Sequence, residues 1–185
     1  MGVTGLYGGA FDPPHVGHVE VARAAKEQFG LERFVVLVAE RPGHKDVHAS
    51  PDDRLALARA AFPGDEVRLD PHPRTVELLR AEEFDDPLFV IGADEFRDFP
   101  TWKEPDDVLN LTRLAVATRP GFPRDELDAV LEQLGTPERV LFFDIEPQPV
   151  ASRDLRARAA AGEPLDGLVP AEVARLIRER RLYRP

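Results

Sequence analysis

Short apolar runs alternate with segments of helical periodicity along most of the chain. The run Phe34–Ala39 is apolar without a break, which is typical of a parallel strand that is covered on both faces. Upstream of it, apolar residues recur at helical spacing at Val19, Ala22, Ala25 and Phe29. The pattern therefore predicts strands that alternate with helices.

The same pattern gives bounds for each expected element. The expected strands are Val3–Tyr7, Phe34–Ala39, Val67–Leu69, Leu88–Ile91, Leu114–Ala117 and Val140–Asp144. The expected helices are Val16–Phe29 with Gly30 as its stop, a helix from the N-cap Ser50 to Phe62, Thr75–Glu82, Asp106–Leu111, Arg124–Leu134, one from about Ser152, and Ala171–Arg180. Strands and helices that alternate at this spacing predict an α/β fold with a doubly wound parallel sheet and helices at the C-terminus.

Length and composition narrow the class of protein. A chain of 185 residues fits a single domain, 1–185, whose helical C-terminal part begins at about residue 150. No run approaches the ~18 apolar residues of a membrane-spanning helix, no secretory leader is visible, and the chain has 0 cysteines. We therefore expect a cytoplasmic protein with no membrane partner. The net charge of -10 argues against nucleic acid as a partner, although a few cations in one cleft can still hold a phosphorylated small molecule.

The candidate chemistry lies in the loops that follow the expected strands. Ligands of doubly wound sheets bind at the carboxyl ends of the strands. The loops after Tyr7, Ala39, Ile91, Ala117 and Asp144 should therefore share one cleft. The candidate motifs all lie in these loops, except the acceptor segment Arg74–Leu79.

The first of these loops joins a strand to a helix through the sequence GGAFDPPHVGH, residues 8–18. Gly8 and Gly9 allow the backbone to approach a ligand closely, and the free N–H groups at the helix start favour an anion. His15 and His18 are three residues apart, so both imidazoles can lie on one face and donate hydrogen bonds to phosphoryl oxygens. A helix-start histidine can also be a cap or a surface group. A metal-binding pair is a further alternative, but no third histidine or cysteine is near.

Taken whole, the loop resembles the His-x-Gly-His signature of the nucleotidyltransferase superfamily, and in particular the nicotinate-mononucleotide adenylyltransferase family. The resemblance implies a Rossmann-like fold and the transfer of AMP from ATP to nicotinate mononucleotide, which yields nicotinate adenine dinucleotide and pyrophosphate. It also implies that His15 and His18 are catalytic and that Gly8, Gly9, Ala10 and Phe11 bind ATP together with His18. Mg²⁺ is expected as the companion of the nucleotide rather than in a metal site of the protein.

Two further segments resemble the family. The turn Glu40–Lys45 is similar to a proline-rich turn ending in His-Lys, which implies that Lys45 is catalytic and bridges the donor and acceptor phosphates. Ile91–Asp94 is similar to the family's Gly-Ala-Asp segment, so Gly92 would admit the nucleotide and Asp94 would accept a hydrogen bond from a ribose hydroxyl or from a bound ammonium-like group. Trp102, in the sequence Thr101-Trp102-Lys103, would stack on the pyridine ring, or would only pack against the core or a lid.

The later motifs extend the resemblance to the end of the chain. Arg119-Pro120-Gly121 would shape the acceptor pocket, or would be a plain turn. Val150–Arg156 is similar to a family segment in which Ser152 is an N-cap that binds the outer phosphates of ATP and Arg156 holds the leaving pyrophosphate. The final Arg181–Arg184 is also similar to the family's ending.

The sequence departs from the family pattern at several positions. Ala10, Ala151 and Arg153 stand where hydroxyl-bearing residues are usual. The acceptor segment keeps Thr75 but carries Arg74 in place of an aromatic residue and Leu78 in place of a second threonine. Arg74 could pair with a nicotinate carboxylate or point to solvent.

The identity of the acceptor is therefore less firmly indicated than the type of reaction. Nicotinamide mononucleotide and phosphopantetheine stay open as acceptors, as does a non-catalytic adenine-nucleotide sensor. A homo-oligomer also stays open as an alternative to a monomer.

Overall fold

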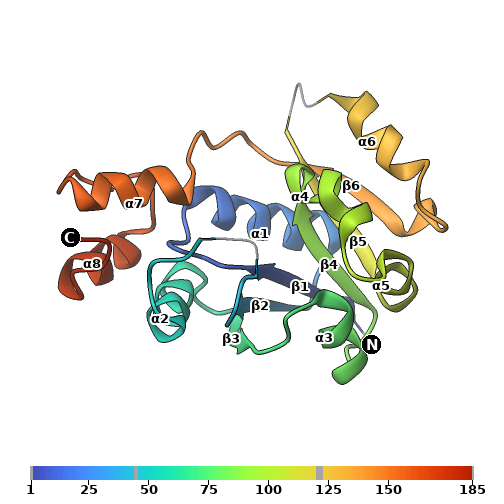
Figure 1. Ribbon diagram of the computed structural model, residues 1–185, viewed down its shortest axis with the longest axis horizontal. Helices are drawn as coiled ribbons and strands as arrows, with labels where there is room; N and C mark the ends of the chain where they lie inside the picture. The colour runs from blue at the N-terminus through green and yellow to red at the C-terminus, as the bar shows by residue number, and fades with distance from the viewer. Residues whose placement is uncertain (1, 44–45, 120–122, 185) are drawn as a thin grey trace.

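The computed structural model describes residues 2–43, 46–119 and 123–184 (Figure 1). Its strands are β1 (Thr4–Gly9), β2 (Arg33–Ala39), β3 (Glu66–Asp70), β4 (Pro87–Gly92), β5 (Arg113–Thr118) and β6 (Val140–Asp144). Its helices are α1 (Val16–Phe29), α2 (Pro51–Ala61), α3 (Thr75–Ala81), α4 (Ala93–Asp98), α5 (Pro105–Leu111), α6 (Arg124–Leu131), α7 (Ser152–Ala160) and α8 (Ala171–Glu179), with 3-10 turns η1 (Phe99–Thr101) and η2 (Pro137–Arg139). None of the helices in this part of the chain combines the length and hydrophobicity that a bilayer crossing requires.

The strands form a parallel six-stranded sheet in the order β3-β2-β1-β4-β5-β6. Strands β2 and β3 are added on one side of β1, and strands β4, β5 and β6 follow on its other side. Between these two strands, connections leave in opposite directions and open a crevice at the carboxyl ends of the strands. Gly9 and Gly92 end the two strands that border this crevice.

Helices cover both faces of the sheet, with α1, α2, α7 and α8 on one face and α3 to α6 on the other (Figure 1). Strand β2 contributes alternate side chains to the two layers. Val36 and Val38 pack in the first layer, whereas Val35 and Leu37 pack in the second. All four are at most 1% exposed, and burying each such side chain contributes about 1.5–3 kcal/mol. The apolar run in β2 is therefore unbroken because both of its faces are buried.

The predicted fold class is confirmed, and several element bounds agree closely with the prediction. Helix α1 spans Val16–Phe29 and ends at Gly30, which adopts a left-handed φ of 58°. Ser50 caps α2, since its hydroxyl accepts the Asp53 N–H at 3.1 Å. Gly30 and Ser50 adjoin the helix ends that they define, so these ends could be predicted from the sequence.

Three predicted bounds are wrong, each for a local reason. Strand β1 continues through Gly8 and Gly9, because both pair with β2 and need no side chain to do so. Helix α6 ends at Leu131 rather than Leu134, because the chain tightens into i→i+3 turns there. A loop was expected after Ile91, but the six-residue helix α4 begins there. The acidic residues in its first turn stabilise the helix because they interact favourably with the positive end of its dipole.

Candidate active site

The start of α1 holds the two histidines in a reciprocal capping box. His15 is the N-cap residue, and its Nδ1 accepts the Gly17 N–H at 3.2 Å. The Nδ1 of His18 accepts the His15 N–H, also at 3.2 Å. The two ring centroids lie 3.8 Å apart, which confirms that both imidazoles share one face. The alternative of a capping role for His15 is confirmed as well. His15 therefore both caps the N-terminus of α1 and forms the imidazole pair with His18.

These hydrogen bonds determine which ring nitrogens carry protons. An Nδ1 that accepts a hydrogen bond is unprotonated, so in a neutral ring the proton lies on Nε2. Burial lowers the pKa of His15 to about 4, so this ring is neutral at physiological pH. The neutral His15 ring therefore carries its proton on Nε2 and can donate it to a ligand.

Glycine at two positions makes room for this arrangement. A Cβ on Gly17 would lie 3.0 Å from the His15 ring, so a side chain there would require the ring to shift by a few tenths of an ångström. At the end of β4, a Cβ on Gly92 would meet no atom of the described residues within 4 Å. The crevice side of β4 is therefore open at the position where the sequence predicts nucleotide binding.

Phe11 packs against His18. It is 2% exposed, has a φ of 49°, and its ring lies edge-on to His18 with centroids 5.2 Å apart. It also packs edge-on against Tyr7 and Phe62. The side chain of Phe11 is thus part of the core, and any contact with a nucleotide falls to its backbone.

A buried arginine that no sequence motif predicted joins the first two loops. Arg54 of α2 is 1% exposed, and its Nη1 donates to the carbonyl oxygens of Ala10 at 3.0 Å and Ala39 at 2.7 Å. Its remaining nitrogens donate to the carbonyls of Glu40 at 3.0 Å and Ala49 at 3.3 Å. The carboxyl ends of β1 and β2 are therefore held together by one guanidinium. Its partners are all backbone carbonyls, so no pattern of side chains marks it.

Asp12, also buried at 2% exposed, joins the loop to α7. Arg156 of α7 donates through Nη1 to the Asp12 carbonyl at 2.8 Å, and the side chain of Arg156 is 14% exposed. Ser152 lies one turn earlier, and its hydroxyl donates to the Pro13 carbonyl at 2.9 Å. The structure thus brings Arg156 to the loop that carries the histidines.

The predicted N-cap role of Ser152 is wrong. Ala151 is the N-cap residue and Ser152 is the first helical residue of α7. The hydroxyl of Ser152 is engaged with Pro13, so the tertiary hydrogen bond replaces the local cap that serine usually forms.

The predicted acceptor residues lie around α3 and η1. Trp102 is half-buried and its ring lies edge-on to Phe99, with centroids 5.2 Å apart. Its neighbour Lys103 pairs with Glu77 of α3 at 2.7 Å. This ion pair joins the tryptophan segment to the helix that begins at Thr75.

Arg74 is exposed and lies beside the loop that follows β2. A Cβ built on Gly43 would be 3.4 Å from Arg74 Nη1, which itself donates to the Pro73 carbonyl at 2.8 Å. Arg74 therefore approaches the turn in which the sequence places Lys45. Lys45 itself lies outside the described residues, so its role stays a prediction.

Comparisons with known proteins agree with this geometry. Residues 6–158 match the model of the cytidylyltransferase-like family. A relative from Bordetella avium is 36% identical over 98% of both chains, and one from Chlorobaculum parvum is 34% identical over 98% of both. Both are named "Probable nicotinate-nucleotide adenylyltransferase".

The chain belongs to the nicotinate-nucleotide adenylyltransferase family. Among solved structures, the adenylyltransferase of Plasmodium falciparum for nicotinic acid mononucleotide, complexed with NaAD, has a TM-score of 0.75. It is 15% identical and the match covers 99% of this chain and 98% of that one, so it establishes the shared fold. The predicted family and enzyme class are thereby confirmed.

Two predicted site residues of this adenylyltransferase lie at exposed positions. Asp94 is in the first turn of α4 and pairs with Arg97 at 2.6 Å, with 68% of its side chain exposed. Arg119 is exposed directly after β5, while residues 120–122 lie outside the described part of the chain. Their predicted contacts with ribose and acceptor stay predictions.

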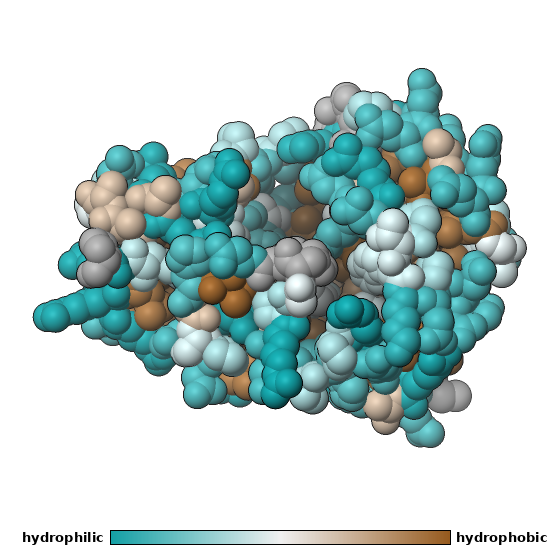
Figure 2. Space-filling model, in the orientation of Figure 1, coloured by the Kyte–Doolittle hydropathy of each residue, from teal (hydrophilic) through white to brown (hydrophobic). Residues whose placement is uncertain are grey.

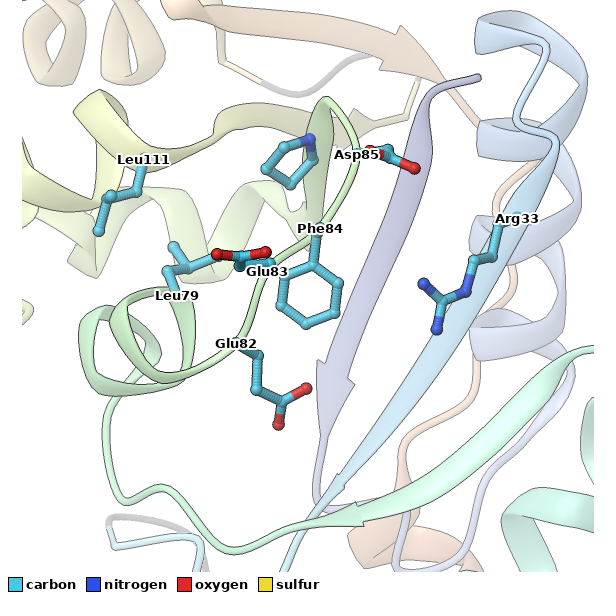
Figure 3. Close-up of a pocket in the computed structure, with 8 residues that line it drawn as sticks. Arg33, Leu79, Glu82, Glu83, Phe84, Asp85 and Leu111 are labelled. Atoms are coloured by element: carbon cyan, nitrogen blue, oxygen red, sulfur yellow. The ribbon is translucent and has the colours of Figure 1, made fainter. Parts of the chain in front are cut away.

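A cavity elsewhere in the adenylyltransferase has the wrong charge for phosphate chemistry (Figure 3). It has a volume of about 530 Å³ and lies at the amino ends of β2 and β4, away from the carboxyl ends that carry the histidines. Its lining residues are Arg33, Leu79, Glu82, Glu83, Phe84, Asp85, Pro87 and Leu111. Three carboxylates in its wall would repel a triphosphate.

In Figure 2, a separate hollow near the middle of the face seen in Figure 1 is surrounded mostly by hydrophilic residues.

Proposed function

We propose that this enzyme transfers AMP from ATP to nicotinate mononucleotide and releases pyrophosphate and nicotinate adenine dinucleotide. The observation that carries the proposal is the close pair of imidazoles, His15 and His18, beside the β1/β4 crevice. The names of the relatives and the NaAD bound to the Plasmodium enzyme support this choice of substrates.

The reaction needs positioning and charge stabilisation. An oxygen of the acceptor 5′-phosphate attacks the α-phosphorus of ATP, and the bond from that phosphorus to the bridging oxygen of the β-phosphate breaks. The electron pair leaves with pyrophosphate. Because the attacking phosphate is already anionic, no general base and no covalent enzyme intermediate is required.

The two histidines act in this scheme as hydrogen-bond donors, and the His15 ring is neutral. Their Nε2–H groups point positive hydrogen atoms at the oxygens on which negative charge grows. The helix start beneath them adds its own partial positive charge. Since the Nδ1 atoms are held by backbone N–H groups, the donors are oriented before ATP arrives.

Arg156 and Lys45 supply full positive charge. Arg156 engages a neutral carbonyl of Asp12, which leaves its charge available to the outer phosphates. Lys45 would bridge the donor and acceptor phosphates, and the first amides of α7 would bind the leaving pyrophosphate in place of the predicted Ser152 cap.

On the acceptor side, Trp102 would stack on the pyridine ring and Arg74 would pair with its carboxylate. Thr75, at the first position of α3, and Arg119 would border the same pocket. A carboxylate partner for Arg74 is what favours the nicotinate form over the amide.

ATP would enter as its magnesium complex. Within the described ranges, no group of three or more His, Cys, Asp or Glu residues could hold a metal ion. In this proposal the ion is held by the phosphates and by water, as hard Mg²⁺ commonly is in nucleotide complexes.

A panel of acceptors tests the proposal. ATP is incubated with the enzyme and nicotinate mononucleotide, nicotinamide mononucleotide or phosphopantetheine, and both pyrophosphate and the adenylylated product are measured. We expect the highest kcat/KM with nicotinate mononucleotide. A higher value with another acceptor would overturn the substrate, and ATP binding without pyrophosphate release from any acceptor would indicate a sensor.

A further inference from the structure

The C-terminal tail of the chain reaches the loop that carries the histidines. The hydroxyl of Tyr183 donates to Oδ1 of Asp12 at 2.7 Å, across 171 residues of sequence. Asp12 is 2% exposed, so this hydrogen bond lies in the interior beneath the site. The proposed chemistry does not use Tyr183, although the sequence around it resembles the ending of the family.

The carboxylate of Asp12 is held by donors from two directions. The backbone N–H of His48 donates to Oδ2 at 2.6 Å and that of Ala49 donates to Oδ1 at 3.2 Å. Tyr183 supplies a third donor, which comes from the tail. Asp12 thereby connects the loops after β1 and β2 with the end of the chain.

The same aspartate determines how Arg156 is engaged. Arg156 Nη1 lies 2.8 Å from the Asp12 carbonyl oxygen but 3.9 Å from its carboxylate oxygen Oδ2. The arginine is therefore close to a negative charge without forming a short ion pair with it. A short ion pair would compete with phosphate for the guanidinium.

The backbone conformation of the C-terminal tail and an ion pair at its start place the Tyr183 hydroxyl beside Asp12. Arg181 and Tyr183 both have left-handed backbones, with φ values of 54° and 64°, which is costly for residues other than glycine. The preceding Arg180 pairs with Asp53 of α2 at 2.8 Å and anchors the end of α8. Burial and the charge of Asp12 raise the pKa of Tyr183, so its hydroxyl keeps the proton that it donates.

We propose that Tyr183 is a positioning residue that holds the Asp12 carboxylate away from Arg156, so that the guanidinium stays available to the triphosphate. The inference rests on the proposed function only in giving Arg156 the role of a phosphate ligand. Without the hydroxyl, the Asp12 carboxylate loses a donor and turns towards Arg156, whose Nη1 lies 3.9 Å from Oδ2.

The test compares Tyr183→Phe with Arg180→Gln. Tyr183→Phe removes one oxygen and keeps the buried ring, whereas Arg180→Gln weakens the docking of the tail without touching Asp12. We expect Tyr183→Phe to raise the Kd for ATP, measured by calorimetry, and the KM for ATP by about tenfold, with the KM of the acceptor unchanged. Arg180→Gln should leave all three constants within about twofold of the wild type.

Hydrogen exchange gives a readout that needs no turnover. The amides of His48 and Ala49 donate to Asp12, so they should exchange faster in Tyr183→Phe and not in Arg180→Gln. Unchanged ATP affinity in Tyr183→Phe, or an equal loss in both variants, would overturn the inference. A wild-type chain that binds ATP but transfers nothing would refute the proposed function alone, and the ATP affinities of the variants would still decide the role of Tyr183.

Discussion

The rings of His15 and His18 lie with their centroids 3.8 Å apart and their planes tilted by 32°. Two imidazolium cations this close would repel each other strongly, and burial lowers the pKa of His15 to about 4. In the proposed reaction His15 would therefore act as a neutral N–H donor beside His18, while Arg156 and Lys45 would supply the positive charge. This division of roles has consequences for stability, activity and pH dependence.

The first prediction concerns stability against pH. The pKa of His15 is about 4 in the folded chain and 6.5 in the unfolded chain, so the unfolded chain binds more protons between these values. The free energy of unfolding should therefore rise with pH from about 4 to 6.5, by at most about 1.4 kcal/mol per pH unit from this group. His15 contributes no further dependence above that window.

Urea unfolding of the wild type and of His15→Gln at several pH values measures this effect. The difference in free energy of unfolding between the two proteins should shrink as the pH falls from 6.5 to 4. A constant difference across this range would show that His15 is not buried as a neutral ring.

Arg54 gives a prediction about the scaffold. Arg54→Met removes the donors to four backbone carbonyls in the interior, and should lower the free energy of unfolding by about 2–4 kcal/mol. Arg59→Met on the exposed side of the same helix is the matched control, and should change it by less than about 1 kcal/mol. Equal effects in urea unfolding would mean that Arg54 does not hold the β1 and β2 loops together.

Trp102 gives a prediction about the acceptor. It is the chain's single tryptophan, so its fluorescence reports directly on ligand stacking. Nicotinate mononucleotide should quench this fluorescence, and Trp102→Leu should raise the KM of the acceptor by roughly tenfold while leaving the KM of ATP unchanged. An acceptor KM that does not change would mean that Trp102 serves to pack against Phe89 and Phe99 and does not bind the acceptor.

The fold was largely predictable because its signals are local. The apolar run of β2 and the glycine after α1 lie within or next to the elements they define. The short helix α4 was not predicted because six residues carry too little periodicity to be recognised. Local propensity was misleading at Ser152, where a hydrogen bond to Pro13 replaces the expected cap.

The site was only partly predictable, for a related reason. Gly17, His15 and His18 are close in sequence, so their spacing already placed both rings on one face. Arg54 and Tyr183 were given no role because their partners are distant backbone carbonyls and a buried carboxylate. No pattern along the chain shows such contacts.

The role of the histidine pair is tested by the kcat of pyrophosphate release from ATP and nicotinate mononucleotide in His18→Asn, with His18→Gln beside it. The Asn oxygen can still accept the His15 N–H in place of Nδ1 but offers no donor at the Nε2 position, whereas the Gln amide can reach that position. We predict that kcat falls at least ~100-fold in His18→Asn and is partly restored in His18→Gln. A kcat near that of the wild type in His18→Asn would contradict the claim that the Nε2–H donor of His18 stabilises the transferring phosphoryl group.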